Sequence, residues 1–126
     1  TGEAMLYFYG SEKFATKTGG AEVTGDFTAT GNVTAYSDER LKENIKPIEN
    51  AVDKVKQLRG VTYDWKETGE ASVGVIAQEV EAVFPELVVE NEEYKSVDYG
   101  RLTSVLIEAI KEQQAQIDEL KAKLGE

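Results

Sequence analysis

The chain has 126 residues and a net charge of −10, from 24 acidic and 14 basic side chains, with neither histidine nor cysteine. This length suits one small domain or a small domain with an appendage, and the acidic balance argues against a phosphate-backbone partner. The lack of His and Cys excludes a Ser-His-Asp triad and thiolate chemistry, so a hydrolytic site would need Lys or a carboxylate as its base. No apolar run approaches the ~20 residues that span a bilayer. We expect no metal, cofactor, nucleic acid or membrane partner.

The first third of the chain is rich in Gly, Thr and Ala and predicts β-structure. Met5–Tyr9 has the aromatic composition of a strand, and a six-residue repeat follows as Thr24–Ala29 and Thr30–Ala35. Each repeat unit places one large apolar residue, Phe27 or Val33, beside a Gly-Asp or Gly-Asn turn signal. The repeat predicts either short turns stacked along an axis or an ordinary hairpin joined by a Gly-Asn turn.

From Ser37 onward the chain is charged and amphipathic. A short helical segment from Ser37 to Ile45 would end before Pro47, because the residue before a proline disfavours helical geometry. Pro47 suits the first turn of a second helix, whose apolar face would carry Ile48, Val52, Val55 and Leu58. The rest of this region predicts a small mixed α+β domain of short hairpins and helices, with strands at 61–65 and 73–76, a helix at 77–84, and strands at 87–89 and 94–97.

The C-terminal segment carries a heptad pattern, which predicts a long coiled-coil helix over 97–126. Six residues follow one another at spacings of four and three, with Ile110, Ile117 and Leu124 at a and Leu106, Gln113 and Leu120 at d. The pattern favours self-association through this seam, and the alternative is one amphipathic helix packed on its own domain. Ile at a with Leu at d leans towards two strands, and Gln113 sets register without fixing a number. The heptads alone do not select a trimer.

Three blocks of residues, in order, carry a resemblance to a known family. They are Ser37–Ile45, Gly74–Val88, and Val97–Leu102 followed by Leu106–Glu112. Together they resemble the self-cleaving C-terminal intramolecular chaperone domain of bacteriophage tail fibres and tailspikes. The resemblance covers about residues 37–126.

The resemblance implies that residues 37–126 assemble as a homotrimer, guide three chains into an intertwined fibre and then cut themselves off. It implies Ser37 as the nucleophile, Lys42 as the base and the Tyr36–Ser37 bond as the cleavage site. Residues 1–36 would be the C-terminal end of a β-structured stalk, which could be triple-stranded. The partners would be other copies and the upstream stalk of the same chain. The precursor of the virion fibre would be made in the host cytoplasm, and the chaperone fragment would be released after cleavage.

A Ser-Lys pair is chemically reasonable, since a Lys can take the hydroxyl proton when it is neutral. Two features of the segment complicate this pair. Five helical residues turn about 500°, which leaves Ser37 and Lys42 about 140° apart on a regular helix. The segment must therefore be irregular, or Lys42 must approach Ser37 of another chain. In addition, Asp38, Glu39 and Glu43 favour the charged form of Lys42, so burial or the nearby Arg40 must outweigh them.

Three alternatives to a self-cleaving chaperone stay open. Without the resemblance, the Ser-Asp-Glu sequence from Ser37 is typical of a helix N-cap followed by acids in the first turn. A trimerisation and fibre-tip module could keep the fold and never cut. A general Ser-Lys hydrolase could act on other substrates, although no pocket motif supports it.

Overall fold

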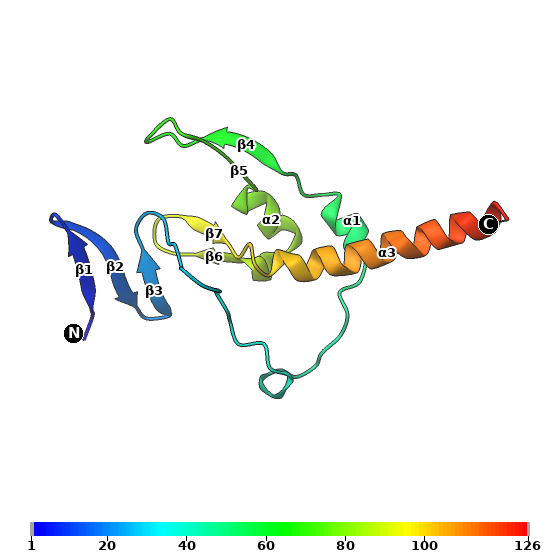
Figure 1. Cartoon of the computed structure of the whole chain (residues 1–126), viewed down its shortest axis with the longest axis horizontal. Helices are drawn as coiled ribbons and strands as arrows, with labels where there is room; N and C mark the ends of the chain where they lie inside the picture. The colour runs from blue at the N-terminus through cyan, green and yellow to red at the C-terminus, as the bar shows by residue number, and fades with distance from the viewer. Residues whose placement is uncertain (1, 126) are drawn as a thin grey trace. The chain divides into compact units, whose positions relative to one another are not determined.

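The computed structural model describes residues 2–125 and divides the chain into two compact units, Thr1–Glu43 and Asn44–Glu126. It is a mixed α and β structure with small antiparallel sheets and a long C-terminal helix (Figure 1), which confirms that part of the predicted α+β class. Thr1 and Glu126, which end the predicted ranges 1–36 and 97–126, lie outside the described residues.

The first unit contains a three-stranded antiparallel sheet in the order β1-β2-β3. Its strands are Met5–Phe8, Ser11–Lys17 and Gly20–Val23. The predicted strand at Met5–Tyr9 is confirmed as β1, and it ends at Phe8 because Tyr9 adopts a positive φ of 48° at the turn. Only Ala15 is a buried apolar residue among the described residues of this unit. A sheet with so little covered surface gains little from the hydrophobic effect.

The Thr- and Gly-rich repeat has neither of its two predicted β forms in the single chain. Residues 24–36 contain no strand. The large apolar side chains of the two units, Phe27 and Val33, are 70% and 77% exposed. One apolar residue in six cannot bury a face without a neighbour, and no strand among residues 2–125 pairs with this segment.

The helices predicted from Ser37 and from Pro47 are much shorter than expected. The first is a single 3-10 turn, η1, over Glu39–Leu41. The second, α1, begins only at Ala51 and ends at Val55, because Asn50 has a left-handed backbone with a φ of 55° that a regular helix cannot contain. The prediction was wrong about the turn that Pro47 and Ile48 were expected to form.

The second unit confirms both predicted hairpins and the helix between them. The pair β4-β5 matches Val61 with Gly74 and Asp64 with Ala71, so β5 begins before the predicted Val73. The pair β6-β7 matches Val88 with Val97. The elements from β4 to β7 are β4 Val61–Asp64, β5 Ala71–Gly74, α2 Ala77–Val83, η2 Pro85–Leu87, β6 Val88–Glu90 and β7 Lys95–Val97.

The core of the second unit lies where α2 and η2 meet the start of the long helix α3. Val80, Phe84, Leu87 and Val105 are all at most 5% exposed, and apolar residues of α1 and the hairpins pack around them. Each such side chain contributes about 1.5–3 kcal/mol when it leaves water. This cluster is the main source of stability among the described residues of the unit.

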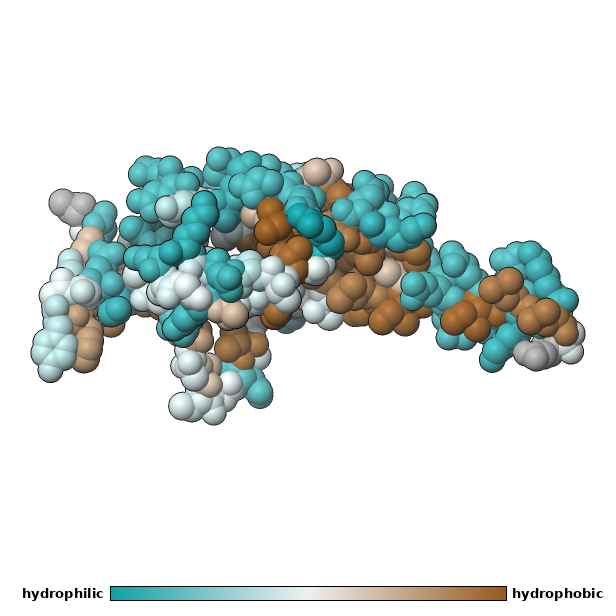
Figure 2. Space-filling view, turned by 90° about the horizontal axis from the view of Figure 1, so that it is seen from above, coloured by the Kyte–Doolittle hydropathy of each residue, from teal (hydrophilic) through white to brown (hydrophobic). Residues whose placement is uncertain are grey.

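The long helix α3 runs over Leu102–Lys123, inside the predicted range 97–126. The residues that its own unit buries are Val105 and Ala109. The heptad stripe lies elsewhere on the helix and is open, and Figure 2 shows apolar side chains at the surface of this end of the unit. The exposed fractions of its apolar members are 48%, 64%, 46%, 59% and 76% for Leu106, Ile110, Ile117, Leu120 and Leu124. Packing on its own domain therefore does not explain the heptads.

Candidate functional site

The segment that carries Ser37 and Lys42 is shaped by one side-chain cap. The Oδ1 atom of Asp38 accepts a hydrogen bond from the backbone N–H of Arg40 at 2.8 Å and starts the 3-10 turn. The residue that caps the turn is thus Asp38, not Ser37. Lys42 then takes an extended conformation, with φ −124° and ψ 149°, which ends the turn and redirects the chain. The Ser37 hydroxyl is left with a different partner.

That partner is Lys42. Its Nζ donates a hydrogen bond to the Oγ of Ser37 at 2.6 Å within the same chain. A regular helix would separate the two side chains by about 140°, and the 3-10 turn followed by an extended residue removes that separation. The contact corresponds to the irregular-segment alternative. To act as a base, the amine must lose a proton and accept the hydroxyl proton across this same contact.

Near this pair, the guanidinium group of Arg40 forms an ion pair with the carboxylate of Asp38. Its Nε and Nη2 lie 3.1 Å and 2.8 Å from the two carboxylate oxygens of Asp38. Hydrogen bonding to Arg40 lowers the pKa of the Asp38 carboxyl, and the same contact raises the pKa of Arg40. Ser37 and Lys42 are both exposed. Neither burial nor an unpaired guanidinium therefore accompanies Lys42 in the single chain.

The residue before Ser37 is open to solvent on almost every side. The Tyr36 side chain is 96% exposed. With Asp38, Arg40 and Leu41 it lines an open depression of about 510 Å³. The peptide bond between Tyr36 and Ser37 lies in a segment without helix or strand, so no backbone ladder hinders its rearrangement.

Comparison with known proteins matches this segment to a family. Residues 37–89 match the family described as chaperone of endosialidase. The chain is 45% identical over 103 residues to the long tail fiber protein Gp37 of Enterobacteria phage K3, covering 74% of this chain and 8% of that protein. Residues 37–89 belong to the chaperone-of-endosialidase family. The resemblance to the tail fibre chaperone domain is confirmed.

Two other relatives show how widely the domain occurs. The long tail fiber protein Gp37 of Salmonella phage S16 is 39% identical over 107 residues, which cover 75% of this chain and 14% of that protein. Myelin regulatory factor homolog 1 of Caenorhabditis elegans is 31% identical over 116 residues, which cover 82% of this chain and 12% of that protein. The chain thus spans only a small part of the curated relatives that it matches.

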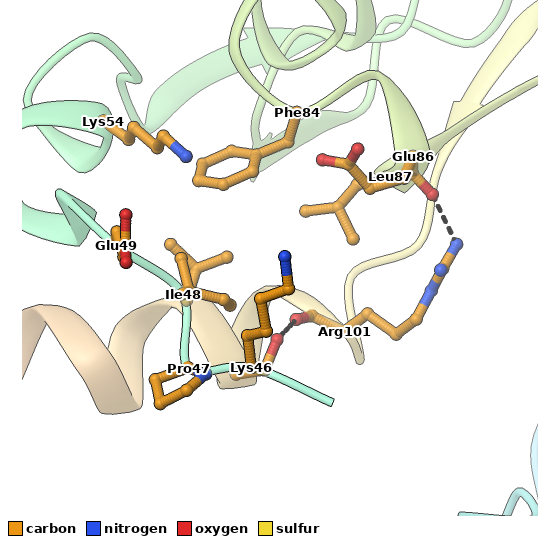
Figure 3. Close-up of a pocket in the computed structure, with 11 residues that line it drawn as sticks. Lys46, Pro47, Ile48, Glu49, Lys54, Phe84, Glu86, Leu87 and Arg101 are labelled. Atoms are coloured by element: carbon orange, nitrogen blue, oxygen red, sulfur yellow. Dashed lines mark hydrogen bonds between the residues drawn. The ribbon is translucent and has the colours of Figure 1, made fainter. Parts of the chain in front are cut away.

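The second unit also holds a pocket of about 350 Å³ (Figure 3). Its apolar lining includes Phe84 and Leu87, and Lys54 places its Nζ 5.4 Å from the centroid of the Phe84 ring. None of the residues from Ser37 to Lys42 lines it. Among residues 2–125 no group of three His, Cys, Asp or Glu side chains could hold a metal ion, and no helix is long and apolar enough to cross a membrane.

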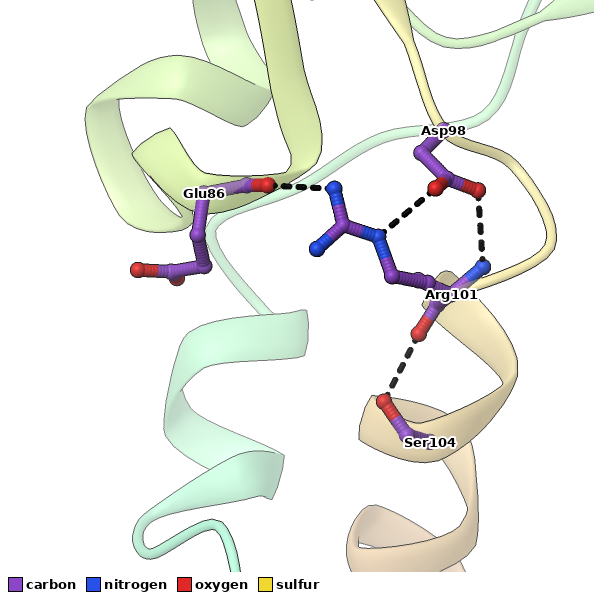
Figure 4. Close-up of polar contacts among 4 residues, drawn as sticks. All are labelled: Glu86, Asp98, Arg101 and Ser104. Atoms are coloured by element: carbon purple, nitrogen blue, oxygen red, sulfur yellow. Dashed lines mark hydrogen bonds and ion pairs between the residues drawn. The ribbon is translucent and has the colours of Figure 1, made fainter. Parts of the chain in front are cut away.

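A polar cluster that sequence reasoning missed fixes the beginning of α3 in the second unit (Figure 4). Arg101 donates from Nε to Asp98 at 2.6 Å and from Nη2 to the backbone carbonyl of Glu86 at 2.7 Å. Asp98 also accepts from the backbone N–H of Arg101 at 3.1 Å. These contacts, the side-chain one first, lower the pKa of the Asp98 carboxyl. The signal in the sequence was an acid three residues before an Arg at a helix start.

Proposed function

We propose that this chain is the C-terminal chaperone of a phage tail fibre or tailspike, which assembles as a trimer and then cuts itself off between Tyr36 and Ser37. The family match and the tail fibre relatives support the chaperone role. The observation that carries the cleavage is the 2.6 Å hydrogen bond between Lys42 Nζ and Ser37 Oγ. On this proposal residues 1–36 are the end of the fibre stalk and 37–126 the released fragment.

The cleavage would proceed by attack of Ser37 on its own peptide bond. A neutral Lys42 takes the proton of the Ser37 hydroxyl, and the oxygen attacks the carbonyl carbon of Tyr36. The carbon–nitrogen bond breaks, the amine of Ser37 receives the proton from Lys42, and Tyr36 is left as an ester on the Ser37 oxygen. Water then hydrolyses the ester to the Tyr36 carboxylate and the free hydroxyl. Because nucleophile and target are adjacent in one chain, their placement can contribute about 7–11 kcal/mol of barrier reduction.

Assembly would supply what the single chain lacks. Lys42 is exposed, and Arg40 is paired with Asp38. Covering this segment with another chain would remove water from the ammonium group and favour its neutral form. Cleavage would then wait until the fibre had assembled.

The trimer contact would be the heptad seam of α3, formed by Leu106, Ile110, Gln113, Ile117, Leu120 and Leu124. The apolar members of this stripe are at least 46% exposed in the single chain. A coiled coil buries such a stripe by inserting each a and d side chain between residues of the partner helix. The partners of the chain would be its own copies and the upstream stalk. The domain would act on the tail fibre precursor and leave the fibre after cleavage.

A second candidate is a trimerisation and fibre-tip module that does not cut. The observation in its favour is that Ser37 and Lys42 are both exposed, so the burial that a lysine base needs is missing around this pair in the single chain. The two candidates share the fold and the seam, and they differ in the fate of the bond between Tyr36 and Ser37.

Mass spectrometry of freshly made protein separates them. The wild-type chain is expected to give a fragment that begins at Ser37, and Ser37→Ala and Lys42→Met are expected to stay whole. Lys46→Met is the matched control, because it removes a nearby lysine without touching the Ser37 hydroxyl, and it is expected to cut like the wild type. A wild-type chain that assembles and stays whole would favour the non-cleaving module.

A further inference from the structure

The short helix α1 begins with two backbone N–H groups that a distant side chain satisfies. Ala51 donates to Oε2 of Glu112 at 2.7 Å, and Val52 donates to Oε1 of the same carboxylate at 3.1 Å. Glu112 belongs to α3, so the cap comes from another helix of the same unit, and α1 lies beside α3 in Figure 1. A carboxylate that accepts two N–H bonds at a helix start is a strong cap.

The start of helix α1 depends on this cap, although residues such as Val55 pack against the core of the unit. Helix α1 is 5 residues long, and isolated helices of that length do not hold in water. The side chain of its own N-cap residue, Asn50, makes no capping hydrogen bond. Ala51 is 0% exposed, so water cannot replace the carboxylate at its N–H. Loss of the Glu112 carboxylate would leave the buried N–H of Ala51 without a hydrogen-bond acceptor.

Glu112 lies at a boundary within α3. Val105 and Ala109, before it, are buried by their own unit, whereas every described residue from 113 to 125 is exposed. In a regular helix the carbonyl of Glu112 accepts a hydrogen bond from the N–H of Gln116, which lies in the part of α3 that is exposed among the described residues. Seam residues Ile110 and Gln113 flank Glu112 on either side in the sequence. Packing of the seam would therefore hold Glu112 in place.

Helix α1 in turn follows the proposed cleavage motif closely in the chain. Only residues 43–50 separate Lys42 from Ala51. A fixed start of α1 limits the positions that this connecting segment can take, because a short tether restricts its free end. Glu112 thus lies on the helix that carries the proposed seam and contacts the helix that follows the proposed cutting pair in the chain.

We propose that Glu112 is a positioning residue that couples assembly through α3 to the order of α1 and, through residues 43–50, to cleavage at Ser37. This inference rests on the proposed function. Seam formation fixes α3 around Glu112, the carboxylate closes the start of α1, and α1 anchors the C-terminal end of the segment that carries Lys42. By linkage, the same cap favours the assembled state.

Amide hydrogen exchange of the full chain, with sedimentation and mass analysis on the same samples, tests the coupling. In the wild type, exchange at Ala51 and Val52 is expected to slow by about tenfold or more between the dilute and the assembled protein. Glu112→Gln replaces one acceptor oxygen with an amide donor that faces an N–H group. It is expected to assemble, yet to keep fast exchange at both positions and to cut more slowly. Glu112→Asp, which keeps the charge on a shorter side chain, should behave alike.

Glu119→Gln is the matched control, because it removes a carboxylate one heptad further along that pairs only with Lys123 at 3.3 Å among the described residues. It should match the wild type in both readouts. Protection of Ala51 and Val52 in assembled Glu112→Gln, or equal protection in dilute and assembled wild type, would overturn the coupling. A wild type that assembles without cutting contradicts only the cleavage proposal, since the exchange comparison needs no cleavage. A wild type that stays monomeric at every concentration overturns both the coupling and the proposed assembly, and sedimentation identifies that case.

Discussion

The second unit covers its large apolar residues, whereas the repeat segment of the first unit leaves its own uncovered. Val80 and Val105 are 0% and 2% exposed, and Phe27 and Val33 are 70% and 77% exposed. All four lie in regular patterns, but only the first two are buried among the residues that the structure describes. The contrast separates the residues that the contacts of one chain bury from those that these contacts leave exposed. Exposed apolar residues in a regular pattern are typical of an unfilled interface.

Helix α3 carries one buried and one exposed stripe of apolar residues. Its stripe through Val105 and Ala109 is buried, and its heptad stripe through Ile110 and Ile117 is open. The two stripes share a backbone, so a substitution can be directed at one and leave the other intact. Folding of the unit and assembly of copies are therefore separable by experiment.

The largest effect is expected from charges in the heptad stripe. Ile110→Lys with Ile117→Lys would place charged groups in every chain of the seam, where burying them without partners is very unfavourable. We expect complete loss of assembly, with the sedimentation mass falling to that of one chain. The second unit should stay folded, because neither residue belongs to its buried cluster.

Two lysines introduced on the face of α3 opposite the seam are the control for that experiment. Ala115 and Ala122 are exposed and occupy the outward f position of consecutive heptads. Ala115→Lys with Ala122→Lys adds the same charge to the same helix and should leave the mass of the assembly unchanged. An unchanged mass for the Ile110 and Ile117 variant would instead disprove the seam.

A pair of matched phenylalanines compares the two units directly. Phe84→Ala removes a side chain that is 5% exposed and should destabilise the second unit by about 3–5 kcal/mol. Phe27→Ala removes one that is 70% exposed, so it should leave the unfolding midpoint of the dilute chain almost unchanged. In the assembled protein Phe27→Ala should lower the midpoint, if copies cover the repeat. Denaturant unfolding at low and high protein concentration measures both, and equal small effects of Phe27→Ala in the two would show that the repeat is not an interface.

Periodicity predicted the elements that local contacts build. The strand at Met5 follows from its aromatic composition, helix α2 from the spacing of its apolar residues, and the hairpin that ends at Val97 from two short apolar runs around a polar turn. The repeat was predicted to form β-structure but has no strand over residues 24–36, because its one large apolar residue in six gives a single segment no face to bury. Helix α1 was predicted too long, since nothing in the sequence shows that Asn50 adopts a left-handed backbone.

The candidate site was only partly readable from the sequence. The resemblance gave Ser37 and Lys42, but helical geometry placed them on different sides of a helix. Their contact depends on the Asp38 cap and on the extended conformation of Lys42, which are local choices that periodicity does not report. Glu112 could not be found at all, because a cap from residues 60 positions away leaves no sequence signal.

A smaller effect tests the packing between β5 and the loop before α3. An added Cβ at Gly74 would lie 2.6 Å from the hydroxyl oxygen of Tyr99, which also accepts a hydrogen bond from the N–H of Val75 at 3.2 Å. Gly74→Ala should displace the phenol, break that bond and destabilise the unit by about 1 kcal/mol. Tyr99→Phe removes the clashing atom, so Gly74→Ala should cost less in that background. Additive losses in a double-mutant cycle would rule out this contact as the cause.

The smallest effect concerns the ion pair at the start of α3. Hydrogen bonds from the Arg101 side chain, and then from its backbone, lower the folded pKa of Asp98 below the ordinary value of 3.8. The pair therefore stabilises the fold above that value, and its contribution is lost as the pH falls through the lower folded pKa. The Asp98 side chain is 40% exposed, so solvent screening limits the contribution to about 0.2–1 kcal/mol.

Asp98→Asn should accordingly lower the unfolding midpoint at pH 7 and lose part of its deficit as the solution becomes strongly acidic. Asp64→Asn is the control, because the Asp64 carboxylate makes no ion pair or hydrogen bond among the described residues, and it should leave the midpoint unchanged at pH 7. A deficit for Asp98→Asn that stays constant down to the most acidic solution would assign the loss to the shape of the turn. The pH dependence of the unfolding midpoint distinguishes the ion pair from the geometry of the turn, since Asp98→Asn and Asp64→Asn both keep a side chain of the same size.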